Sequence, residues 1–594
     1  MELKSSKNYY SMRKTTMVHY KVRVGLAQIN PVMGDLPTNR DMIINYIKKA
    51  EEHHCDITLF PEMAITGYPV QDLVYKQDFV ENNLKVIDQI KPHVRDSIAV
   101  IGCITNAEKS KKTTVPFYNS AAVIYPDGNI KYIHKHLLPN YDVFDEKRYF
   151  NSSPYFPLIK LDQLRIGLEI CEDLWDKQYS VKVSKELKKR GANCIFIINA
   201  SPYYIEKPQI REALVKQDAN KLKMPLVYLN IVGGQDEIVF DGRSFVVDHY
   251  GRTIFRMHAF EEEFSYFDLP VPVKEKYEST SLQIIEDPKK IYKTNYLRVN
   301  TNEEIFKALV LNLRDYYYKT GIFKKIVLGL SGGIDSSFTA VIACHAVGPE
   351  NVMGVLMPSR FSSEHSVGDA IQLCKNLGMK YIEVPIKKIH DIYESEVRTY
   401  YEVEEFSVAD ENLQSRIRGV LLMYYSNKFD ALLVSTGNKS EIAVGYCTLY
   451  GDTNGGKNVP GDLYKVQIYE LAEWINKNIK PVKNSGSNQV IPQNSIDKPP
   501  SAELKPNQTD QDTLPPYEVL DAILYEMIEN QKSIRGIIKM GFDPEVVRNV
   551  ERLYHTSEYK RAQLAQTIKI TKKSFGTGYR FPVVNKYHLT RHNI

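Results

Sequence analysis

The sequence predicts an α/β protein built from two successive domains, and three observations support this. At 594 residues the chain exceeds the roughly 250–300 residues at which single hydrophobic cores stop growing. Between residues 22 and 62 a strand, an amphipathic helix and a second strand follow one another. In the middle of the chain the apolar run 326–330 breaks into Ser331-Gly332-Gly333 and continues as a helix over 338–346. Such a strand, turn and helix is typical of a doubly wound parallel sheet.

Composition and charge restrict the class of protein. The chain is 43% hydrophobic and 25% charged, which is ordinary for a globular protein. A net charge of +5 is too dilute to indicate nucleic-acid binding, and no apolar run approaches the roughly 20 residues that span a bilayer. The seven cysteines form no Cys-x-x-Cys pair, so we expect no disulfide framework and a cytoplasmic location. Residues 1–20 lack an apolar stretch, and we interpret them as an extension, not a secretory signal.

Three side chains in the first half have the types that nucleophilic catalysis needs. Glu62 ends the second predicted strand, Lys135 follows the strand-like run 121–125 and its turn, and Cys171 ends the run 164–170. Alone, a strand-end glutamate is usually a solvated loop residue and a free cysteine is usually core packing. Together they supply a base, a cation and a nucleophile at strand ends, where ligands of α/β sheets gather. We expect the positive charge to lower the pKa of the thiol.

Glu62, Lys135 and Cys171, in this order and with these neighbours, resemble the catalytic triad of the nitrilase superfamily. The resemblance implies an α-β-β-α sandwich over residues 21–270 that hydrolyses C–N bonds. It also implies that Cys171 attacks a carboxamide to form a thioester, that Glu62 carries the proton, and that Lys135 stabilises the oxyanion. Glu146 is expected as a second glutamate near the lysine.

Two further stretches restrict the resemblance to one group within the nitrilase superfamily. Asn199-Ala-Ser-Pro-Tyr and Gly233-Gly-Gln-Asp-Glu-Ile-Val-Phe-Asp-Gly are similar to a nitrilase-like glutaminase domain. The similarity implies that glutamine is the amide and that it is held by Tyr141, Glu172, Ser201 and Lys207. Residues 271–302 are charged and interrupted by prolines, and we interpret them as the linker between the two domains.

The second half is organised around Leu330-Ser-Gly-Gly-Ile-Asp-Ser. A glycine-rich turn at a helix N-terminus gathers free N–H groups that suit phosphate, and Asp335 offers a carboxylate for Mg²⁺. No Gly-Lys-Ser/Thr closes the turn, so it is not a Walker A loop. It resembles the pyrophosphate loop of ATP pyrophosphatases, which cleave ATP between its α- and β-phosphates. The resemblance implies an ATP site that includes Ser331, Gly332, Gly333, Asp335, Ser336, Ser337 and Thr436.

Stretches further along extend this resemblance over a Rossmann-like, doubly wound domain at 303–594. They are Glu411-Asn-Leu-Gln-Ser-Arg-Ile-Arg, Ser435-Thr-Gly-Asn-Lys-Ser-Glu, Gly445-Tyr-Cys-Thr-Leu-Tyr-Gly-Asp and Lys498-Pro-Pro-Ser-Ala-Glu-Leu. Together they closely resemble the synthetase domain of the glutamine-dependent NAD⁺ synthetases. The resemblance implies Mg²⁺ on Asp335 and Glu441. It implies that deamido-NAD⁺ contacts Asn412, Arg418, Glu441, Asp452 and Lys465. Residues 484–512, rich in Pro, Ser, Asn and Gln, would form a mobile loop over the nucleotide.

The resemblance implies an ATP-dependent amidotransferase. Ammonia released from glutamine at Cys171 would amidate the nicotinate carboxylate of deamido-NAD⁺, which ATP has adenylated with loss of pyrophosphate, and NAD⁺ and AMP would leave. The implied ligands are small molecules and Mg²⁺, with neither nucleic acid nor membrane. The family also implies self-association into homo-oligomers, octamers among them.

Two alternatives stay open from the sequence. One is a different amidotransferase with a pyrophosphate loop, of the GMP-synthetase-like or tRNA-modifying kind. The first usually carries a Cys-His-Glu glutaminase, and the second should show a basic patch or paired cysteines, which this sequence lacks. The other is an inactive ligand-sensing homologue, which would be expected to have lost Cys171, Lys135 or Asp335.

Overall fold

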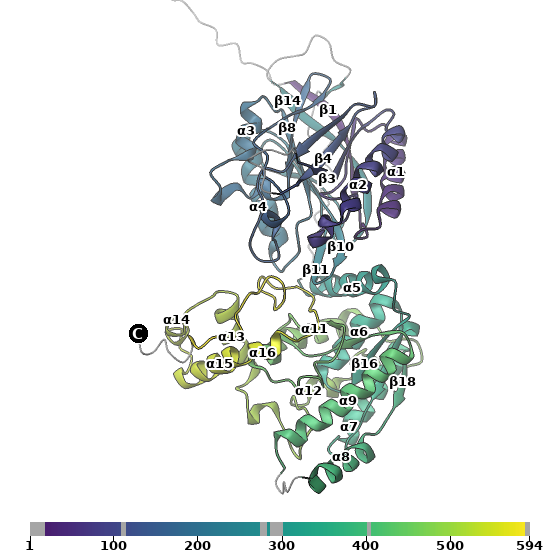
Figure 1. Ribbon diagram of the computed structural model, residues 1–594, viewed down its shortest axis with the longest axis vertical. Helices are drawn as coiled ribbons and strands as arrows, with labels where there is room; N and C mark the ends of the chain where they lie inside the picture. Colours follow the sequence, from purple (N-terminus) through teal and green to yellow (C-terminus); the bar gives the residue numbers. More distant parts are fainter. Residues whose placement is uncertain (1–17, 108–114, 274–281, 286–300, 401–405, 588–594) are drawn as a thin grey trace, which may run out of the picture.

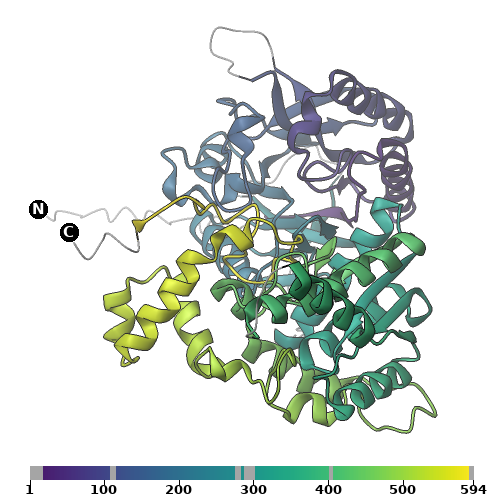
Figure 2. The ribbon, with the colours of Figure 1, turned by 60° about the horizontal axis from the view of Figure 1, so that its bottom comes forward.

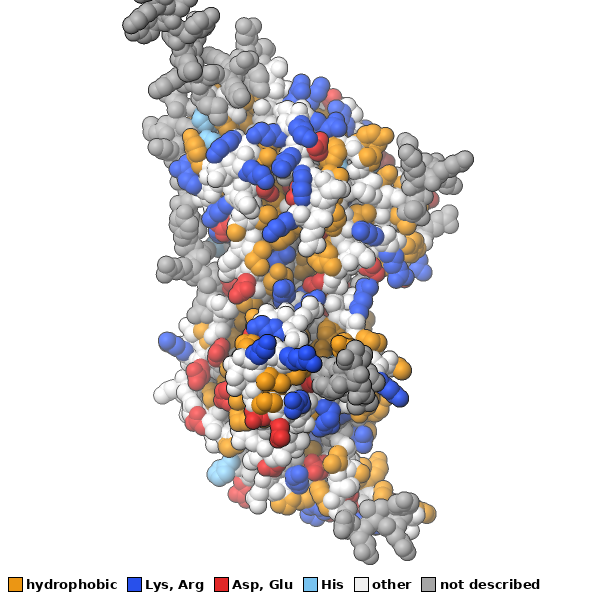
Figure 3. Space-filling model, turned by 90° about the vertical axis from the view of Figure 1, so that its left-hand side faces the viewer, with side chains coloured by type: hydrophobic (Ala, Val, Ile, Leu, Met, Phe, Trp, Pro, Cys, Tyr) orange, Lys and Arg blue, Asp and Glu red, His pale blue; other side chains and the backbone are white. Residues whose placement is uncertain are grey.

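The protein consists of two bodies stacked along its long axis, one from each half of the chain (Figure 1). The computed structural model describes residues 18–107, 115–273, 282–285, 301–400 and 406–587. Figure 2 shows the C-terminal segment, in yellow, running up against the N-terminal body. On the face shown in Figure 3, Lys and Arg side chains are interspersed with apolar and acidic ones. Among the described residues, no helix combines the length and apolar character needed to span a bilayer.

Two sheets packed face to face form the N-terminal half. Within the described residues the first has the order β14-β1-β2-β3-β4-β5, with β15 paired to β1, and the second has the order β13-β12-β9-β8-β7-β6. The first sheet comprises β14 (Glu263–Val273), β1 (Val18–Gln28), β2 (Ile57–Leu59), β3 (Ile98–Asn106), β4 (Phe117–Ile124), β5 (Ile130–His134) and β15 (Ile284–Ile285). The second comprises β13 (Thr253–Arg256), β12 (Phe245–Val247), β9 (Leu226–Asn230), β8 (Cys194–Asn199), β7 (Leu164–Ile170) and β6 (Ile159–Leu161).

Helices cover the outer face of each sheet. Apolar side chains of α1 (Leu36–Glu52) and α2 (Gln77–Ile90) pack on the first sheet, and those of α3 (Val183–Lys189) and α4 (Lys207–Leu222) pack on the second. Between the sheets, inward-facing residues of both form one buried core. Apolar side chains on both faces of these strands explain their near-continuous hydrophobic sequences. The predicted α-β-β-α sandwich is confirmed.

The C-terminal half is a parallel sheet with the order β18-β17-β16-β19-β20, also covered on both faces. Its strands are β18 (Lys380–Glu383), β17 (Val352–Leu356), β16 (Lys325–Leu330), β19 (Ala431–Ser435) and β20 (Lys457–Asn458). One core includes α5 (Thr301–Thr320), α6 (Ile334–Val347), α7 (Glu364–Leu377), α11 (Lys465–Asn478) and α12 (Gln493–Asp497). The opposite core includes side chains along α9 (Val408–Lys428), with α8 (Lys387–Tyr400) beside it. The predicted doubly wound domain is confirmed.

A helical group follows the sheet. Apolar side chains of α13 (Tyr517–Ile528), α14 (Ile534–Ile538) and α15 (Pro544–Thr556) form a core of their own with α10 (Lys439–Val444). The short helix α16 (Glu558–Arg561) ends this group. Arg561 is buried there and donates to the carbonyl of Ala443, so the C-terminal helices are tied to the helix that follows β19.

The two halves meet where a hairpin of the N-terminal half lies along α5 (Figure 1). The hairpin consists of β10 (Val232–Gln235) and β11 (Ile238–Asp241). Asn312 on α5 donates to the carbonyl oxygens of Asp236 and Ile238 at 3.0 and 2.9 Å. Because these bonds are buried or half-buried and lie among apolar side chains from both halves, the junction is part of the packed interior.

The sandwich extends three residues past each end that the sequence predicts for it. β1 begins at Val18, inside the predicted extension 1–20, and β14 ends at Val273, inside the predicted linker 271–302. Val18 pairs with Val273, so these apolar residues continue the antiparallel ladder. Residues 1–17 and most of the predicted linker lie outside the described residues.

Candidate active sites

The structure brings together the three predicted catalytic side chains of the N-terminal half. The Nζ atom of Lys135 donates to Oε1 of Glu62 at 2.7 Å and to Oε1 of Glu146 at 2.8 Å, and Lys135 and Glu62 are fully buried. Cys171 follows β7 directly, opens a short 3-10 turn and has a φ of +48°. Left-handed backbone at a non-glycine residue costs free energy and is found at functional turns. The strand therefore ends by presenting the thiol beside a buried Glu–Lys–Glu cluster.

Electrostatics at this cluster disagree with one expectation from the sequence. The pKa of the Cys171 thiol is raised well above its ordinary value, because burial and the carboxylate of Glu62 outweigh the attraction of Lys135. We had expected the lysine to lower the pKa of this thiol, and that expectation was wrong. Burial also raises the pKa of Glu146, to about 7. A neutral thiol can attack only if a neighbouring group takes its proton, and Glu62 is the carboxylate with the strongest electrostatic effect on the thiol.

Near the thiol lies a cluster of four polar side chains, which we call the glutamine pocket: Tyr141, Glu172, Tyr179 and Lys207. The hydroxyl groups of Tyr141 and Tyr179 donate to the two oxygens of Glu172 at 2.9 and 3.0 Å. Lys207, at the start of α4, places its Nζ atom 3.7 Å from the ring centroid of Trp175. Burial lowers the pKa of Lys207 to about 8, although Cys171 and Glu172 counteract this shift. A carboxylate and an ammonium in one pocket suit a zwitterionic amino acid.

Ser201, the fourth predicted glutamine residue, lies on the loop after β8. Its N–H donates to Oδ1 of Asn230 at 2.9 Å. The preceding N–H, that of Ala200, donates to Oε2 of Glu62 at 2.8 Å. One loop therefore carries a predicted substrate contact and a hydrogen bond to the catalytic carboxylate.

The second site lies where the strand order of the parallel sheet reverses. From β16 the chain continues to β17 and β18 on one side of β16. It then crosses to β19 on the other side. Ser331, Met357 and Thr436 directly follow these three strands. Such a reversal opens a crevice at the carboxyl ends of the strands, which is where open α/β sheets bind ligands. Thr436 is half-buried there.

The glycine-rich turn has the close packing that requires glycine. Gly332 has a φ of +77°, and a Cβ atom there would lie 2.1 Å from the carbonyl oxygen of Ser366. Gly333 caps α6, so the first N–H groups of that helix face the crevice. The hydroxyl groups of Ser336 and Ser337 donate back to the carbonyl of Gly333. These two bonds stiffen the turn.

Carboxylates converge at the predicted metal position. Lys465 forms ion pairs with Asp335 and, at 3.4 Å, with Oε1 of Glu441. Asn438 donates to Asp335 at 3.1 Å. Burial and the nearby carboxylates of Asp335 and Asp510 raise the pKa of Glu441 to about 8, against the attraction of Lys465. Three carboxylates around one ammonium leave negative charge to spare, and carboxylate oxygens are the ligands that Mg²⁺ prefers.

The remaining predicted residues border the same crevice. Thr448 joins two of them, because its hydroxyl donates to Asn412 at 2.6 Å and its N–H donates to Asp452 at 2.7 Å. Arg418 donates from Nε to the carbonyl of Met357 at 3.1 Å, and burial lowers its pKa to about 10. Met357 immediately follows β17, so Arg418 lies beside the crevice. Asp452 stands at an exposed position of its loop, although burial of its carboxyl group raises its pKa.

Both halves match known families. Residues 23–277 match the carbon-nitrogen hydrolase model and residues 305–564 match the NAD synthase model. The chain is 41% identical over 576 residues to a glutamine-dependent NAD(+) synthetase of Synechocystis, covering 95% of this chain and 99% of that protein. It is 39% identical over 594 residues to the enzyme of that name from Thermotoga maritima, covering 96% and 99%.

The chain belongs to the glutamine-dependent NAD⁺ synthetase family. A solved structure of this family, from Acinetobacter baumannii in complex with ADP, is 35% identical and covers 95% of this chain and 99% of that one, with a TM-score of 0.71. Another, from Cytophaga hutchinsonii, has a TM-score of 0.78 at 22% identity, with coverage of 96% and 99%, and supports the fold alone. Family membership decides against the GMP-synthetase-like and tRNA-modifying alternatives.

Several side chains that contact the predicted site residues were not identified from the sequence. Asn119 donates to Glu62 at 2.7 Å, and the hydroxyl of Tyr68 donates to Glu146 at 2.9 Å. Asn119 is a buried amide inside β4, beside the buried Ser120 in a mostly apolar strand, and that was the available signal. Asn438 and Asp510 were likewise not predicted beside Asp335.

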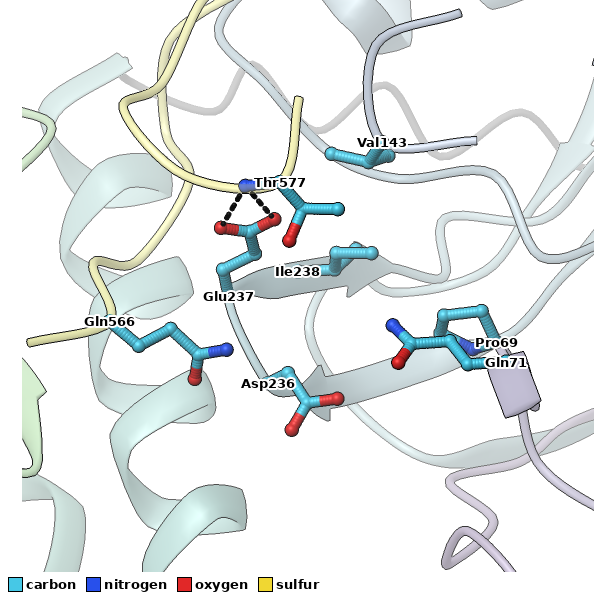
Figure 4. Close-up of a pocket in the computed structure, with 8 residues that line it drawn as sticks. All are labelled: Pro69, Gln71, Val143, Asp236, Glu237, Ile238, Gln566 and Thr577. Atoms are coloured by element: carbon cyan, nitrogen blue, oxygen red, sulfur yellow. Dashed lines mark hydrogen bonds between the residues drawn. The ribbon is translucent and has the colours of Figure 1, made fainter. Parts of the chain in front are cut away.

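A cavity of about 260 Å³ lies at the junction of the two halves of the synthetase (Figure 4). It is lined by Pro69, Gln71, Val143, Asp236, Glu237, Ile238, Gln566 and Thr577. Glu237 accepts a hydrogen bond from the N–H of Thr577 at 3.1 Å, so the hairpin tip and the C-terminal segment close one side of the cavity. Both halves contribute to the lining of this cavity, and none of the predicted site residues lines it.

Proposed function

We propose that the chain makes NAD⁺ from deamido-NAD⁺, ATP and glutamine. Support comes from the two sites, a buried Cys–Glu–Lys cluster and a pyrophosphate loop, on a single chain of this family. ATP is a substrate in this family, which fits the glycine-rich turn. A free carboxylate is a poor acceptor for ammonia, and adenylation supplies AMP as the leaving group.

In the N-terminal half, the thiol of Cys171 attacks the side-chain carboxamide of glutamine while Glu62 takes its proton. Lys135 stabilises the charge that develops on the carboxamide oxygen. Glu62 returns the proton to the departing ammonia, and water then hydrolyses the thioester to glutamate. Tyr141, Glu172, Ser201 and Lys207 hold the amino acid. Glu62 is prepared for this role by donors from Lys135, Asn119 and the backbone of Ala200.

In the C-terminal half, the turn of Ser331, Gly332 and Gly333 at the start of α6 faces the phosphates of ATP. Bound Mg²⁺ would supply charge neutralisation on those phosphates, and Asp335 and Glu441 would hold it. The shared lysine, Lys465, keeps both carboxylates oriented. Ser336, Ser337 and Thr436 shape the nucleotide side, and Asn412, Arg418, Asp452 and Lys465 border the dinucleotide side.

We further propose that the enzyme forms homo-oligomers through α8 and α9. These helices expose large apolar side chains, which in a monomer usually mark an interaction surface. They are Ile392, Tyr393, Val397, Tyr400, Val408, Val420, Met423 and Tyr424. Tyr400→Glu together with Val420→Glu should lower the mass measured by light scattering, and an unchanged mass would contradict this surface.

Free, mostly buried cysteines fit the cytoplasmic location that we propose.

The reaction is tested by product analysis. Supplied with deamido-NAD⁺, ATP and glutamine, the protein should yield NAD⁺, glutamate, AMP and pyrophosphate by mass spectrometry. Cys171→Ala should lose synthesis from glutamine and keep it with high ammonium. ADP and phosphate in place of AMP and pyrophosphate would contradict the adenylation, and loss of both activities in folded Cys171→Ala would contradict the division between the halves.

A further inference from the structure

Behind the glutamine pocket lies a buried ion pair to which the reaction above gives no role. Arg211, on α4 one turn after Lys207, is 1% exposed, and its Nη1 atom donates to Oδ1 of the fully buried Asp241 at 2.9 Å. Its Nη2 atom donates to the carbonyl oxygens of Ser201 and Pro202 at 3.3 and 3.4 Å. The guanidinium therefore joins a carboxylate to the backbone of the loop that carries Ser201.

Stability alone is a weak reason for such a pair. Removing two charges from water is costly, and apolar side chains of similar volume often serve a fold equally well. In the described structure, Nε of Arg211 and Oδ2 of Asp241 have no hydrogen-bond partner although both are buried. An incompletely satisfied buried pair costs more still, which points to a role in positioning its neighbours.

The loop held by the pair connects substrate and catalytic base. Asn230 accepts from the N–H of Ser201 at 2.9 Å and lies 3.5 Å from Oδ1 of Asp241, so the same carboxylate supports the loop at two points. One residue earlier, the N–H of Ala200 donates to Glu62. Glu62 has further donors, whereas Ser201 depends on this network. Loosening the network should therefore affect glutamine binding more than chemistry.

Asp241 also reaches the other half of the protein. It is the last residue of β11, and the first, Ile238, accepts from Asn312 on α5 through its carbonyl oxygen. At the hairpin tip the carbonyl of Glu237 accepts from the N–H of Lys569 at 2.8 Å. The short strand β11 therefore contacts the C-terminal half at its first end and carries Asp241 at its other end.

We propose that Arg211 and Asp241 are positioning residues that fix Ser201 for glutamine, with strand β11 setting their place from the C-terminal half. The inference rests on the proposed glutaminase function and deepens it. Neither residue touches the substrate. Arg211 acts through the backbone carbonyls of Ser201 and Pro202, and Asp241 acts through Arg211 and Asn230. Only the guanidinium fork spans the carboxylate and both carbonyls.

The test uses the full-length enzyme with Arg211→Met and Asp241→Leu combined, which removes both charges and leaves none unpaired. Ammonium-driven NAD⁺ synthesis should stay within about twofold, while KM for glutamine rises about tenfold and kcat for glutamate release falls by less than about threefold. A merely structural pair would lower the amount of active enzyme, reducing kcat at constant KM. An unchanged glutamine KM in the double variant would overturn the proposal.

Arg211→Lys covers the case in which the double variant does not fold. Lysine keeps the charge opposite Asp241 but lacks the fork, so KM for glutamine should rise several-fold without loss of ammonium-driven synthesis. Wild-type KM in Arg211→Lys would overturn the proposal. If the wild-type protein released no glutamate from glutamine, the proposed function itself would have failed, and that result is separate from both outcomes above.

Discussion

At the scale of single residues, both sites are built from buried charges whose neighbours decide their protonation. The raised pKa of Cys171 means that its proton must leave during catalysis, not before it. In the other site, Lys465 is shared between Asp335 and Glu441, and burial, together with the carboxylates of Asp335 and Asp510, raises the pKa of Glu441. Both arrangements become productive only when a ligand arrives with the complementary group.

Asp335→Asn tests the assignment of metal and phosphate. An amide is a poor ligand for Mg²⁺, and it also cannot form the ion pair with Lys465. Synthesis should fall by about two orders of magnitude or more with glutamine and with ammonium alike, because charge neutralisation is lost in the transition state. Glutamate release at Cys171 should persist. Near-normal NAD⁺ formation from ammonium would remove Asp335 from the site.

Lys207 gives the glutamine pocket a pH dependence. With a pKa lowered to about 8, chiefly by burial, it is charged below that pH and neutral above it. A cation facing the carboxylate of glutamine is therefore lost as the pH rises, and KM for glutamine should increase by roughly three- to tenfold between about pH 7 and 9. Lys207→Arg stays charged and should flatten the profile. Parallel KM profiles for both proteins would contradict this, since titration of glutamine itself is common to both.

At the scale of elements, sequence patterns predicted the strands and the residues at their ends. They predicted side-chain contacts between different elements less well. Glu62, Lys135 and Cys171 were identifiable because each follows an apolar run. Asn119 and Tyr68 were not, because their contacts with the two glutamates depend on sheet register and on loops far away in sequence. The hydrogen bonds that Ser336 and Ser337 make inside the turn were likewise not predicted, because they are set by local geometry.

The segment 484–512, predicted as a mobile loop, has two different parts in the structure. Val490 and Ile491 are buried in the main core of the C-terminal half, and Asn376 donates to the carbonyl oxygen of Val490. Removing 485–494 would therefore open that core. The part beyond Lys498 instead rests on polar contacts with α7, since Glu503 accepts from the hydroxyl of Ser366 at 2.6 Å.

Glu503→Ala tests whether this second part serves the nucleotide. Ser366 lies directly against Gly332 of the glycine-rich turn, so Glu503 holds the segment next to the site that we propose for the phosphates. Without its charge-assisted bonds, KM for ATP in ammonium-driven synthesis should rise about tenfold. Asn494→Ala is the matched control, because its contact with Asp369 is exposed and lies on α12, before the part that follows Lys498. Equal KM values for Glu503→Ala and wild type would show that the segment has no such role.

At the scale of the whole molecule, a chain of contacts runs from the synthetase site to the glutamine pocket. Lys439, two residues before Glu441, donates to the hydroxyl of Thr571 in the C-terminal segment at 2.7 Å. Lys569 of that segment lies 3.4 Å from Asp142, and Asp142 follows Tyr141 of the glutamine pocket. Ligands at one site can alter the other only by binding one arrangement of this segment more tightly.

Asp142→Asn tests that route between the sites. In the wild type we expect ATP with deamido-NAD⁺ to raise glutamate release, by a coupling free energy of about 1–3 kcal/mol. The substitution removes the ion pair with the buried Lys569, so the stimulation should fall toward unity while unstimulated hydrolysis stays near normal. Arg580→Ala is the control, because its contact with Asp145, at 3.6 Å, is exposed and such surface pairs contribute little. Equal rates with and without the synthetase ligands in the wild type would show the sites to be independent. Full stimulation in Asp142→Asn would place the route elsewhere.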